Sequence, residues 1–164
     1  MDRIYISALV ENHEGVLARI SSLFTQRGFN IETIAASETS IPQITRITIS
    51  TSGDEEIMNQ MMKQTQKLEE VKAVFALEPS TSVMRELLLV KVEADENSRH
   101  FIREIAEIYR AKIIDLSPES MVIELTGEPK KLDAFLNVLA KYHIIELCRS
   151  GVTALERTKS YVLE

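Results

Sequence analysis

The chain has 164 residues, 45% hydrophobic and 27% charged, so it can bury a core as one domain or two small ones. Its net charge of −6 and its lack of a Lys/Arg cluster argue against a nucleic-acid-binding protein. No apolar run approaches the roughly 18 residues of a membrane span, and no charged-then-apolar leader opens the chain. With a single cysteine, Cys148, this composition predicts a cytoplasmic protein without an internal disulfide.

The first half of the chain predicts the element order β-α-β-β-α-β. Residues 3–11 alternate apolar and polar positions as a strand does, and residues 15–27 carry an apolar stripe at helical spacing. Pro42 separates two further extended runs, and a second helical stripe begins after Asp54. The predicted strands are 3–11, 30–38, 43–51 and 71–77, with helices at 15–27 and between residues 54 and 71.

The second half repeats this order after a polar, proline-containing linker at residues 78–82. The predicted strands are 86–93, 111–117, 120–127 and 144–151, and the predicted helices are 98–110 and 129–143. Two copies of one order predict an α+β protein of two ferredoxin-like βαββαβ domains, residues 1–78 and 83–164. Because the helices would cover one face of each antiparallel sheet, the other face or an edge is expected to be free for a partner.

The sequence offers no catalytic or metal-binding constellation. His13, His100 and His143 lie far apart, with no second ligand at metal spacing. No nucleophile motif, phosphate loop or dinucleotide fingerprint occurs. We therefore expect no catalytic residues, no metal and no enzymatic activity.

The segment around Gly15 is the candidate binding site. A helix N-terminus carries unpaired N–H groups and a positive dipole end, and a glycine lets a carboxylate approach that backbone closely. The amides of Asn12 and Asn30 could pair with the remaining polar groups of a small zwitterion. Alternatively, Asn12 caps the helix and Gly15 merely permits the turn, and the residues alone leave both interpretations open. The corresponding loop of the second half, EADENSRH, has no glycine, so only the first unit is expected to bind a ligand.

Four segments together resemble one known family. These segments are ENHEGVLARISSLFTQRGFNIETI, TRITISTSGDEEIMNQMMKQTQKLEEVKAV, RELLLVKVEA and RSGVTALER. They resemble the small regulatory subunit of acetolactate synthase, also called acetohydroxyacid synthase, whose N-terminal part is an ACT domain. The resemblance implies a non-catalytic homodimer that acts in branched-chain amino-acid biosynthesis. It would activate a separate thiamine-diphosphate-dependent catalytic subunit and confer feedback inhibition by valine or another branched-chain amino acid.

The resemblance also implies where the effector binds. The sites would lie between paired N-terminal domains. One chain would contribute Asn12 and Gly15 with the neighbouring backbone of Glu14, Val16 and Leu17, and the facing chain would contribute Asn30 and Ile31. Thiamine diphosphate, magnesium and FAD would belong to the catalytic partner, and no cofactor to this chain. The alternative is a free-standing ACT-domain amino-acid sensor that acts on another enzyme.

Overall fold

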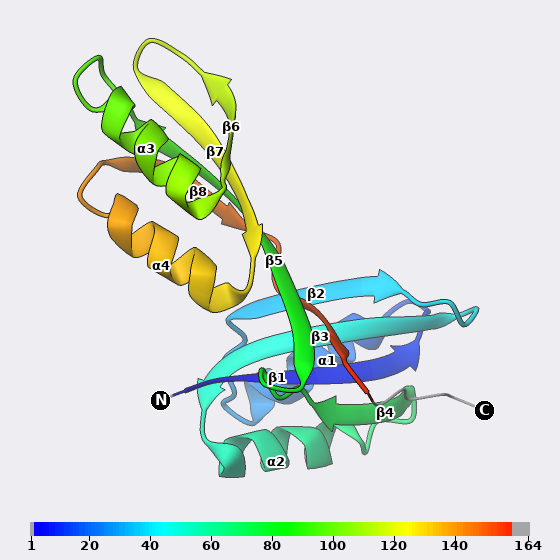
Figure 1. Ribbon diagram of the computed structural model, residues 1–164. Coiled ribbons are helices and arrows are strands. Elements are labelled where there is room, and N and C mark those ends of the chain that lie inside the picture. Colours follow the sequence, from blue (N-terminus) through cyan, green and yellow to red (C-terminus); the bar gives the residue numbers. More distant parts are fainter. Residues whose placement is uncertain (1, 159–164) are drawn as a thin grey trace. The chain divides into compact units, whose positions relative to one another are not determined.

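The computed structural model describes residues 2–158, which form two compact units (Figure 1). The first unit contains the chain up to Val83 and again from Gly151 onward, and the second runs from Met84 to Ser150. The structural division differs from the predicted domains in this last segment, which groups with the first unit. Residues 1 and 159–164, which the predicted domains include, lie outside the described residues.

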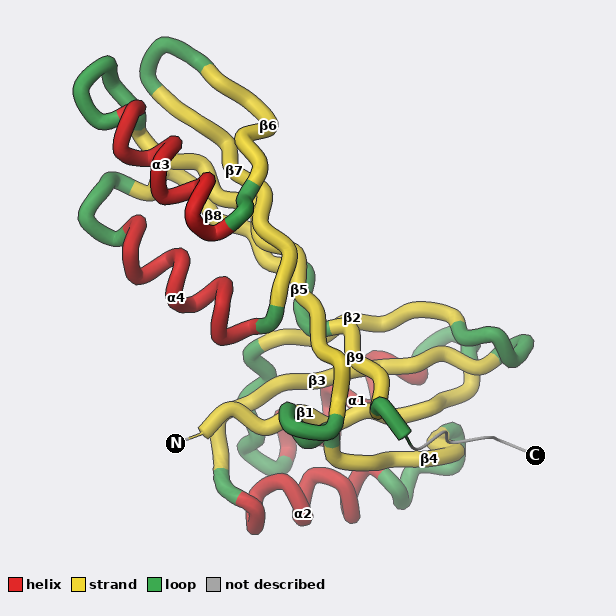
Figure 2. The backbone as a smooth tube through the Cα atoms, in the orientation of Figure 1, coloured by secondary structure: helices red, strands yellow, loops and turns green. Residues whose placement is uncertain are grey.

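The first unit is a four-stranded antiparallel sheet with two helices on one face, as Figures 1 and 2 show. Its strand order is β2-β3-β1-β4. The elements are β1 (Asp2–Glu11), α1 (Val16–Gln26), β2 (Thr33–Glu38), β3 (Ile44–Gly53), α2 (Glu55–Thr65) and β4 (Val71–Ala76). The predicted βαββαβ order is confirmed.

The core of the first unit follows from the two periodicities of the sequence. Alternate residues of β1 and β3 and the apolar stripe of α1 meet between sheet and helices. The helix α2 begins at Asp54, whose Oδ1 accepts a hydrogen bond from the Ile57 N–H at 2.9 Å. The buried cluster is Ile6, Ala8, Val10, Val16, Ile20, Phe24, Ile47, Ile49, Met61 and Val71.

The other face of the first sheet is covered by the chain's own C-terminal segment. Outward-facing residues of this sheet, such as Ser7 and Thr48, are buried, as are Val152 and Ala154. Arg46 Nη1 lies 3.4 Å from the Ala154 carbonyl oxygen, and burial lowers the pKa of Arg46. On the first sheet, therefore, the face predicted to be free for a partner is occupied, whereas the corresponding face of the second sheet exposes Leu87 and Leu89.

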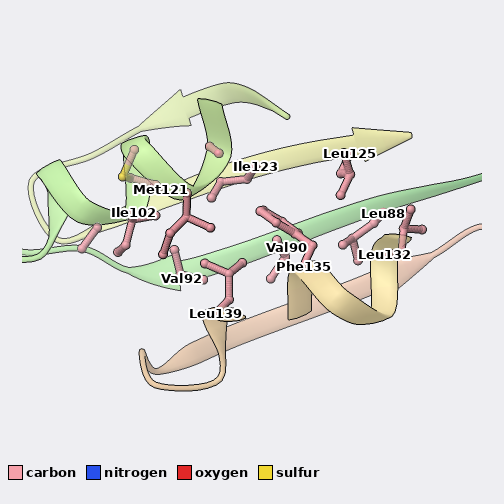
Figure 3. Close-up of a cluster of buried hydrophobic side chains, with 13 residues drawn as sticks. Leu88, Val90, Val92, Ile102, Met121, Ile123, Leu125, Leu132, Phe135 and Leu139 are labelled. Atoms are coloured by element: carbon pink, nitrogen blue, oxygen red, sulfur yellow. The ribbon is translucent and has the colours of Figure 1, made fainter. Parts of the chain in front are cut away.

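The second unit repeats the topology with the strand order β6-β7-β5-β8. Its elements are β5 (Ser82–Glu93), α3 (Arg99–Tyr109), β6 (Lys112–Leu116), β7 (Ser120–Gly127), α4 (Pro129–Leu139) and β8 (Ile144–Arg149). The last strand, β9 (Thr153–Glu156), pairs with β5 but belongs to the first unit. Figure 3 shows side chains of β5, β7, α3 and α4, among them Val90, Ile123 and Phe135, converging in one core. The two ferredoxin-like domains of the predicted α+β fold are therefore confirmed.

Several element boundaries differ from the prediction. The helix predicted over 129–143 ends at Leu139. The last predicted strand, 144–151, ends at Arg149, and an unpredicted strand, β9, follows Gly151. Gly151 has a φ of +80°, and a Cβ there would lie 3.1 Å from the Ile34 carbonyl oxygen. The strand therefore breaks where the backbone must turn closely past β2. Similarly, β5 begins at Ser82 and not at residue 86, because its first residues are extended beside β9.

Candidate functional site

The loop between β1 and α1 exposes a helix N-terminus without a side-chain cap. Gly15 is the N-cap residue of α1, and its φ of +86° is in the left-handed region that favours glycine. No side chain caps α1, and a Cβ built on Gly15 meets no atom within 4 Å. The helix's own hydrogen bonds start with the Arg19 N–H donating to the Gly15 carbonyl oxygen at 3.0 Å. The N–H groups of the first turn of α1 therefore have no side-chain acceptor, and a ligand can reach them past Gly15.

Asn12 binds residues at the end of β2 and in the turn that follows it, and it does not cap α1. Its Nδ2 donates to Glu38 Oε1 at 3.1 Å, and its backbone N–H donates to the Gln43 carbonyl oxygen at 2.7 Å. The interpretation of Asn12 as the cap of α1 is therefore wrong, whereas the need for glycine in the turn is confirmed. Glu38, at the end of β2, is a neighbour of the site that sequence reasoning missed.

The charged side chains near this loop are largely paired with one another. Glu11 binds His13 Nε2 at 3.2 Å and forms an ion pair with Lys72, and the Lys72 hydrogen bond and charge lower the pKa of Glu11. Arg19, in the second turn of α1, forms an ion pair with the buried Glu70. The backbone N–H groups are therefore the donors left for an anion at the helix mouth.

Apolar surface lies directly beside these donors. Val16 is buried in the core, while the neighbouring Leu17 is 46% exposed. Glu14 is exposed on the other side of Gly15. A ligand at the N-terminus of α1 would thus meet N–H donors and an aliphatic side chain, which suits the carboxylate and the side chain of a small apolar amino acid.

The structure separates the predicted site residues into two groups. Asn12, Glu14, Gly15, Val16 and Leu17 gather at the N-terminus of α1. Asn30 and Ile31 follow its C-terminus, with Asn30 exposed and Ile31 half-buried. The eleven residues of α1 span roughly 16 Å, more than the length of a small amino acid. Within one chain the two groups therefore do not form one site.

The loop before the corresponding helix of the second unit has a carboxylate acceptor of its own. Asp95 Oδ1 accepts hydrogen bonds from Ser98 Oγ and the Ser98 N–H, each at 2.7 Å, and from the Asn97 N–H at 3.0 Å. These bonds, first of all the one from the Ser98 hydroxyl, lower the pKa of Asp95. α3 begins at Arg99 and, like α1, has no side-chain cap, but Asp95 accepts from the two N–H groups that directly precede this helix.

Among residues 2–158, no three His, Cys, Asp or Glu side chains are grouped so as to hold a metal ion. The helices in this part of the chain are too short or too polar to cross a bilayer.

Two family models match the chain, one in each half. Residues 6–73 match the AHAS small subunit-like ACT domain, and residues 85–158 match the small subunit of acetolactate synthase. The chain belongs to the acetolactate synthase small-subunit family. The seven predicted effector residues all fall within the region matched by the ACT-domain model.

Relatives from distant organisms cover nearly the whole chain. The probable acetolactate synthase small subunit of Methanothermobacter thermautotrophicus is 46% identical, over 95% of this chain and 94% of that protein. The isozyme 3 small subunit of Escherichia coli is 41% identical, over 94% of this chain and 96% of that protein. The crystal structure of the acetolactate synthase small subunit from Thermotoga maritima matches with a TM-score of 0.84 at 38% identity, covering 98% of this chain and all of that one. Both ferredoxin-like units therefore belong to the architecture of an acetolactate synthase small subunit.

Proposed function

We propose that this small subunit activates a catalytic acetolactate synthase subunit in the cytoplasm and makes it sensitive to feedback inhibition by valine. In this proposal the catalytic partner carries thiamine diphosphate, magnesium and FAD, and this chain carries no cofactor. The chain acts as a homodimer formed through its first units, with valine bound where the two copies meet.

The observation that carries the proposal is the difference between the two helix mouths. The α1 N-terminus has a glycine in the left-handed region and no capping side chain, whereas before α3 the Asp95 carboxylate accepts from the N–H groups of Asn97 and Ser98. A carboxylate ligand can therefore accept from N–H groups at α1 as Asp95 does before α3. The valine carboxylate would accept from the N–H groups that follow Gly15, and its isopropyl group would contact Leu17.

The rest of the ligand needs the second copy. Asn30 and Ile31 lie too far from Gly15 in the same chain, so in the proposed dimer they come from the facing chain. The Asn30 amide then completes the hydrogen bonds of the ligand, and Ile31 covers its aliphatic part. Because valine has few atoms, we expect a dissociation constant between about 1 μM and 1 mM.

Inhibition requires that valine bind one state of the protein more tightly than another. If valine favours a dimer that does not activate the catalytic subunit, a coupling free energy of about 1 to 3 kcal/mol changes the affinity for that subunit by roughly 5- to 150-fold. Thermodynamic reciprocity then requires that the catalytic subunit weaken valine binding by the same factor.

Reconstitution with the catalytic subunit tests this function. The purified chain alone should form no acetolactate from pyruvate, should raise the rate of the catalytic subunit, and should make that rate fall when valine is added. A chain that binds valine but neither binds nor activates a thiamine-diphosphate enzyme would instead be a free-standing sensor.

A further inference from the structure

The strand β6 is an open edge of the second sheet, and its surface is apolar. Among the described strands it pairs only with β7, so its other side presents backbone N–H and C=O groups without a strand partner. All five residues of β6 are exposed, and three of them are aliphatic: Ile113, Ile114 and Leu116, at 36%, 51% and 55% exposure. Such an edge can accept another strand.

The two charges of β6 lie on the same face of the sheet. Lys112 is opposite Glu124 and Asp115 is opposite Val122, and these two β7 residues share one face because they are two positions apart. The irregularity between Ile113 and Asp115 produces this arrangement, since residues three apart in a regular strand face opposite sides. Neither the Lys112 nor the Asp115 side chain makes a hydrogen bond or ion pair with another described residue.

This charge order is complementary to itself. In an antiparallel pair of two β6 strands with the two-fold axis between Ile113 and Ile114, Lys112 of each copy lies opposite Asp115 of the other. Both ion pairs then form on one face of the joined sheet.

The helix α3 beside β6 shows a second complementary pair. Arg99 Nη2 donates to the carbonyl oxygens of Ser117 at 3.3 Å and Pro118 at 2.7 Å, just after β6. The side of α3 that carries Arg99 therefore faces the β6 edge of the sheet. Arg103 follows one turn later on that side and pairs with Glu107, with 3.6 Å between Nε and Oε1. In two antiparallel α3 helices, Arg103 of each copy lies opposite Glu107 of the other.

One two-fold axis can serve both pairs. Between the end of α3 and the start of β6 lie only Arg110 and Ala111. The midpoint of Arg103 and Glu107 lies roughly 8 Å before this connection along the helix. The midpoint of Lys112 and Asp115 lies roughly 10 Å after it along the strand, which runs back in the opposite direction. The two midpoints therefore lie at about the same distance from the α3–β6 connection, so one two-fold axis can pass near both.

The opposite edge, β8, lacks this pattern. Glu146 is paired with Lys91 of the neighbouring strand at 3.2 Å. Arg149 donates to both carboxylate oxygens of the buried Glu86 and to Asp133. The charges of β8 are therefore used within the chain, and those of β6 are not.

We propose that the second unit binds a second copy of this chain through β6 and the Arg103/Glu107 side of α3, joining two sheets edge to edge across a two-fold axis. The exposed Ile113 and Leu116 become covered where the two α3 helices meet. This contact does not depend on valine or on the proposed regulatory function. It uses residues of the second unit alone.

Disulfide trapping tests the register directly. In a Cys148→Ser background, a tagged Lys112→Cys chain is mixed with an untagged Asp115→Cys chain and mildly oxidised. Residues opposite one another in an antiparallel pair have Cα atoms about 4.5 to 5.5 Å apart, which suits a disulfide. The mixture should give a tagged–untagged dimer at least tenfold above two controls, each variant alone and Lys112→Cys mixed with Lys130→Cys on α4.

Charge reversal on α3 tests the second pair. Arg103→Glu in the Lys112→Cys chain places two glutamates face to face, so trapping should fall several-fold. Adding Glu107→Arg to the Asp115→Cys chain restores opposite charges in both positions, and trapping should recover. A merely destabilised α3 would not recover in this way.

Trapping no higher than in the controls would overturn the proposal. A short edge strand with a lysine and a bulge, such as β6, can also be one that avoids pairing with other strands. Failure to trap would favour this protective role for β6.

Discussion

Gly15 meets a backbone requirement that most residues cannot meet at low cost. Its φ of +86° is unfavourable for a residue with a Cβ, although the space around the position is open. Substitutions there therefore change the backbone strain and the charge at the helix mouth, and they do not create a clash. This allows charge and strain to be separated experimentally.

We expect Gly15→Asp to abolish inhibition by valine. The new carboxylate would take the place of the ligand carboxylate and would repel it. Gly15→Asn is the matched control, because asparagine tolerates the left-handed region and is uncharged. Calorimetry should show valine affinity lost in the first variant and kept within about tenfold in the second. Wild-type affinity in a folded Gly15→Asp protein would show that the helix mouth is not the site.

Asn30→Ala tests the other group of site residues. Losing a hydrogen bond to a charged ligand costs roughly 1.5 to 3 kcal/mol, so valine affinity should fall about 10- to 150-fold. Asn97→Ala, in the second unit's loop, is the control and should bind valine as the wild type does. If Asn30→Ala changed affinity by less than twofold, Asn30 would not contact the ligand.

The sequence predicted the geometry around the candidate site unequally well. Gly15 could be identified because a glycine between a strand pattern and a helix pattern has a physical meaning at that position. The Asn12 hydrogen bond to Glu38 could not, because it depends on the register that brings the end of β2 beside the end of β1 through β3. Local patterns fix which residues are at the loop, whereas pairing between strands fixes what they contact.

At the scale of elements, periodicity predicted every helix and strand of the two βαββαβ copies but not β9. The helices α1 to α4 each carry an apolar stripe, which a helical period reveals. The four residues of β9 are too few for a period, and they pair with a strand more than fifty residues away in sequence. Its existence depends on the turn at Gly151 and on contacts with the first sheet.

Gly151→Ala should destabilise the first unit more than an ordinary glycine substitution. The left-handed φ costs roughly 1 kcal/mol for alanine, and the added Cβ would also lie tightly against the Ile34 carbonyl. Gly28→Ala is the matched control, because Gly28 has a φ of +72° but nothing within 4 Å of an added Cβ. Urea denaturation should show the larger loss of unfolding free energy for Gly151→Ala. Equal losses of unfolding free energy in the two variants would mean that the close contact of residue 151 with Ile34 does not destabilise the fold.

A buried ion pair ties β5, β8 and α4 of the second unit together. Arg149 donates to Glu86 at 2.9 and 2.6 Å and to Asp133 at 2.6 Å, and the Glu86 hydrogen bonds raise the pKa of Arg149. Glu86→Ala should lower the free energy of unfolding by roughly 3 to 5 kcal/mol, because it leaves Arg149 without its buried partner. The double change Glu86→Leu with Arg149→Met should lose less, as measured by thermal unfolding. A double variant less stable than Glu86→Ala would show that the pair itself stabilises the fold.

At the scale of the whole molecule, the two units have the same topology but differ in the loops that precede their first helices. In the first unit no side chain caps α1, and the predicted site residues divide between the two ends of this helix. A site built from both groups must be shared by two chains. In a two-fold dimer, each site then takes Gly15 from one copy and Asn30 from the other.

Mixing the two variants that are impaired in valine binding tests whether each site is shared by two chains. In a heterodimer of Gly15→Asp with Asn30→Ala, one site carries both substitutions and the other carries none. After subunit exchange, about half of the dimers are mixed, so the mixture should regain about one quarter of the wild-type valine-binding capacity at wild-type affinity. Calorimetry on each variant alone is the control and should show no such sites. If both groups of residues served one chain, every site would keep one substitution and mixing would restore nothing.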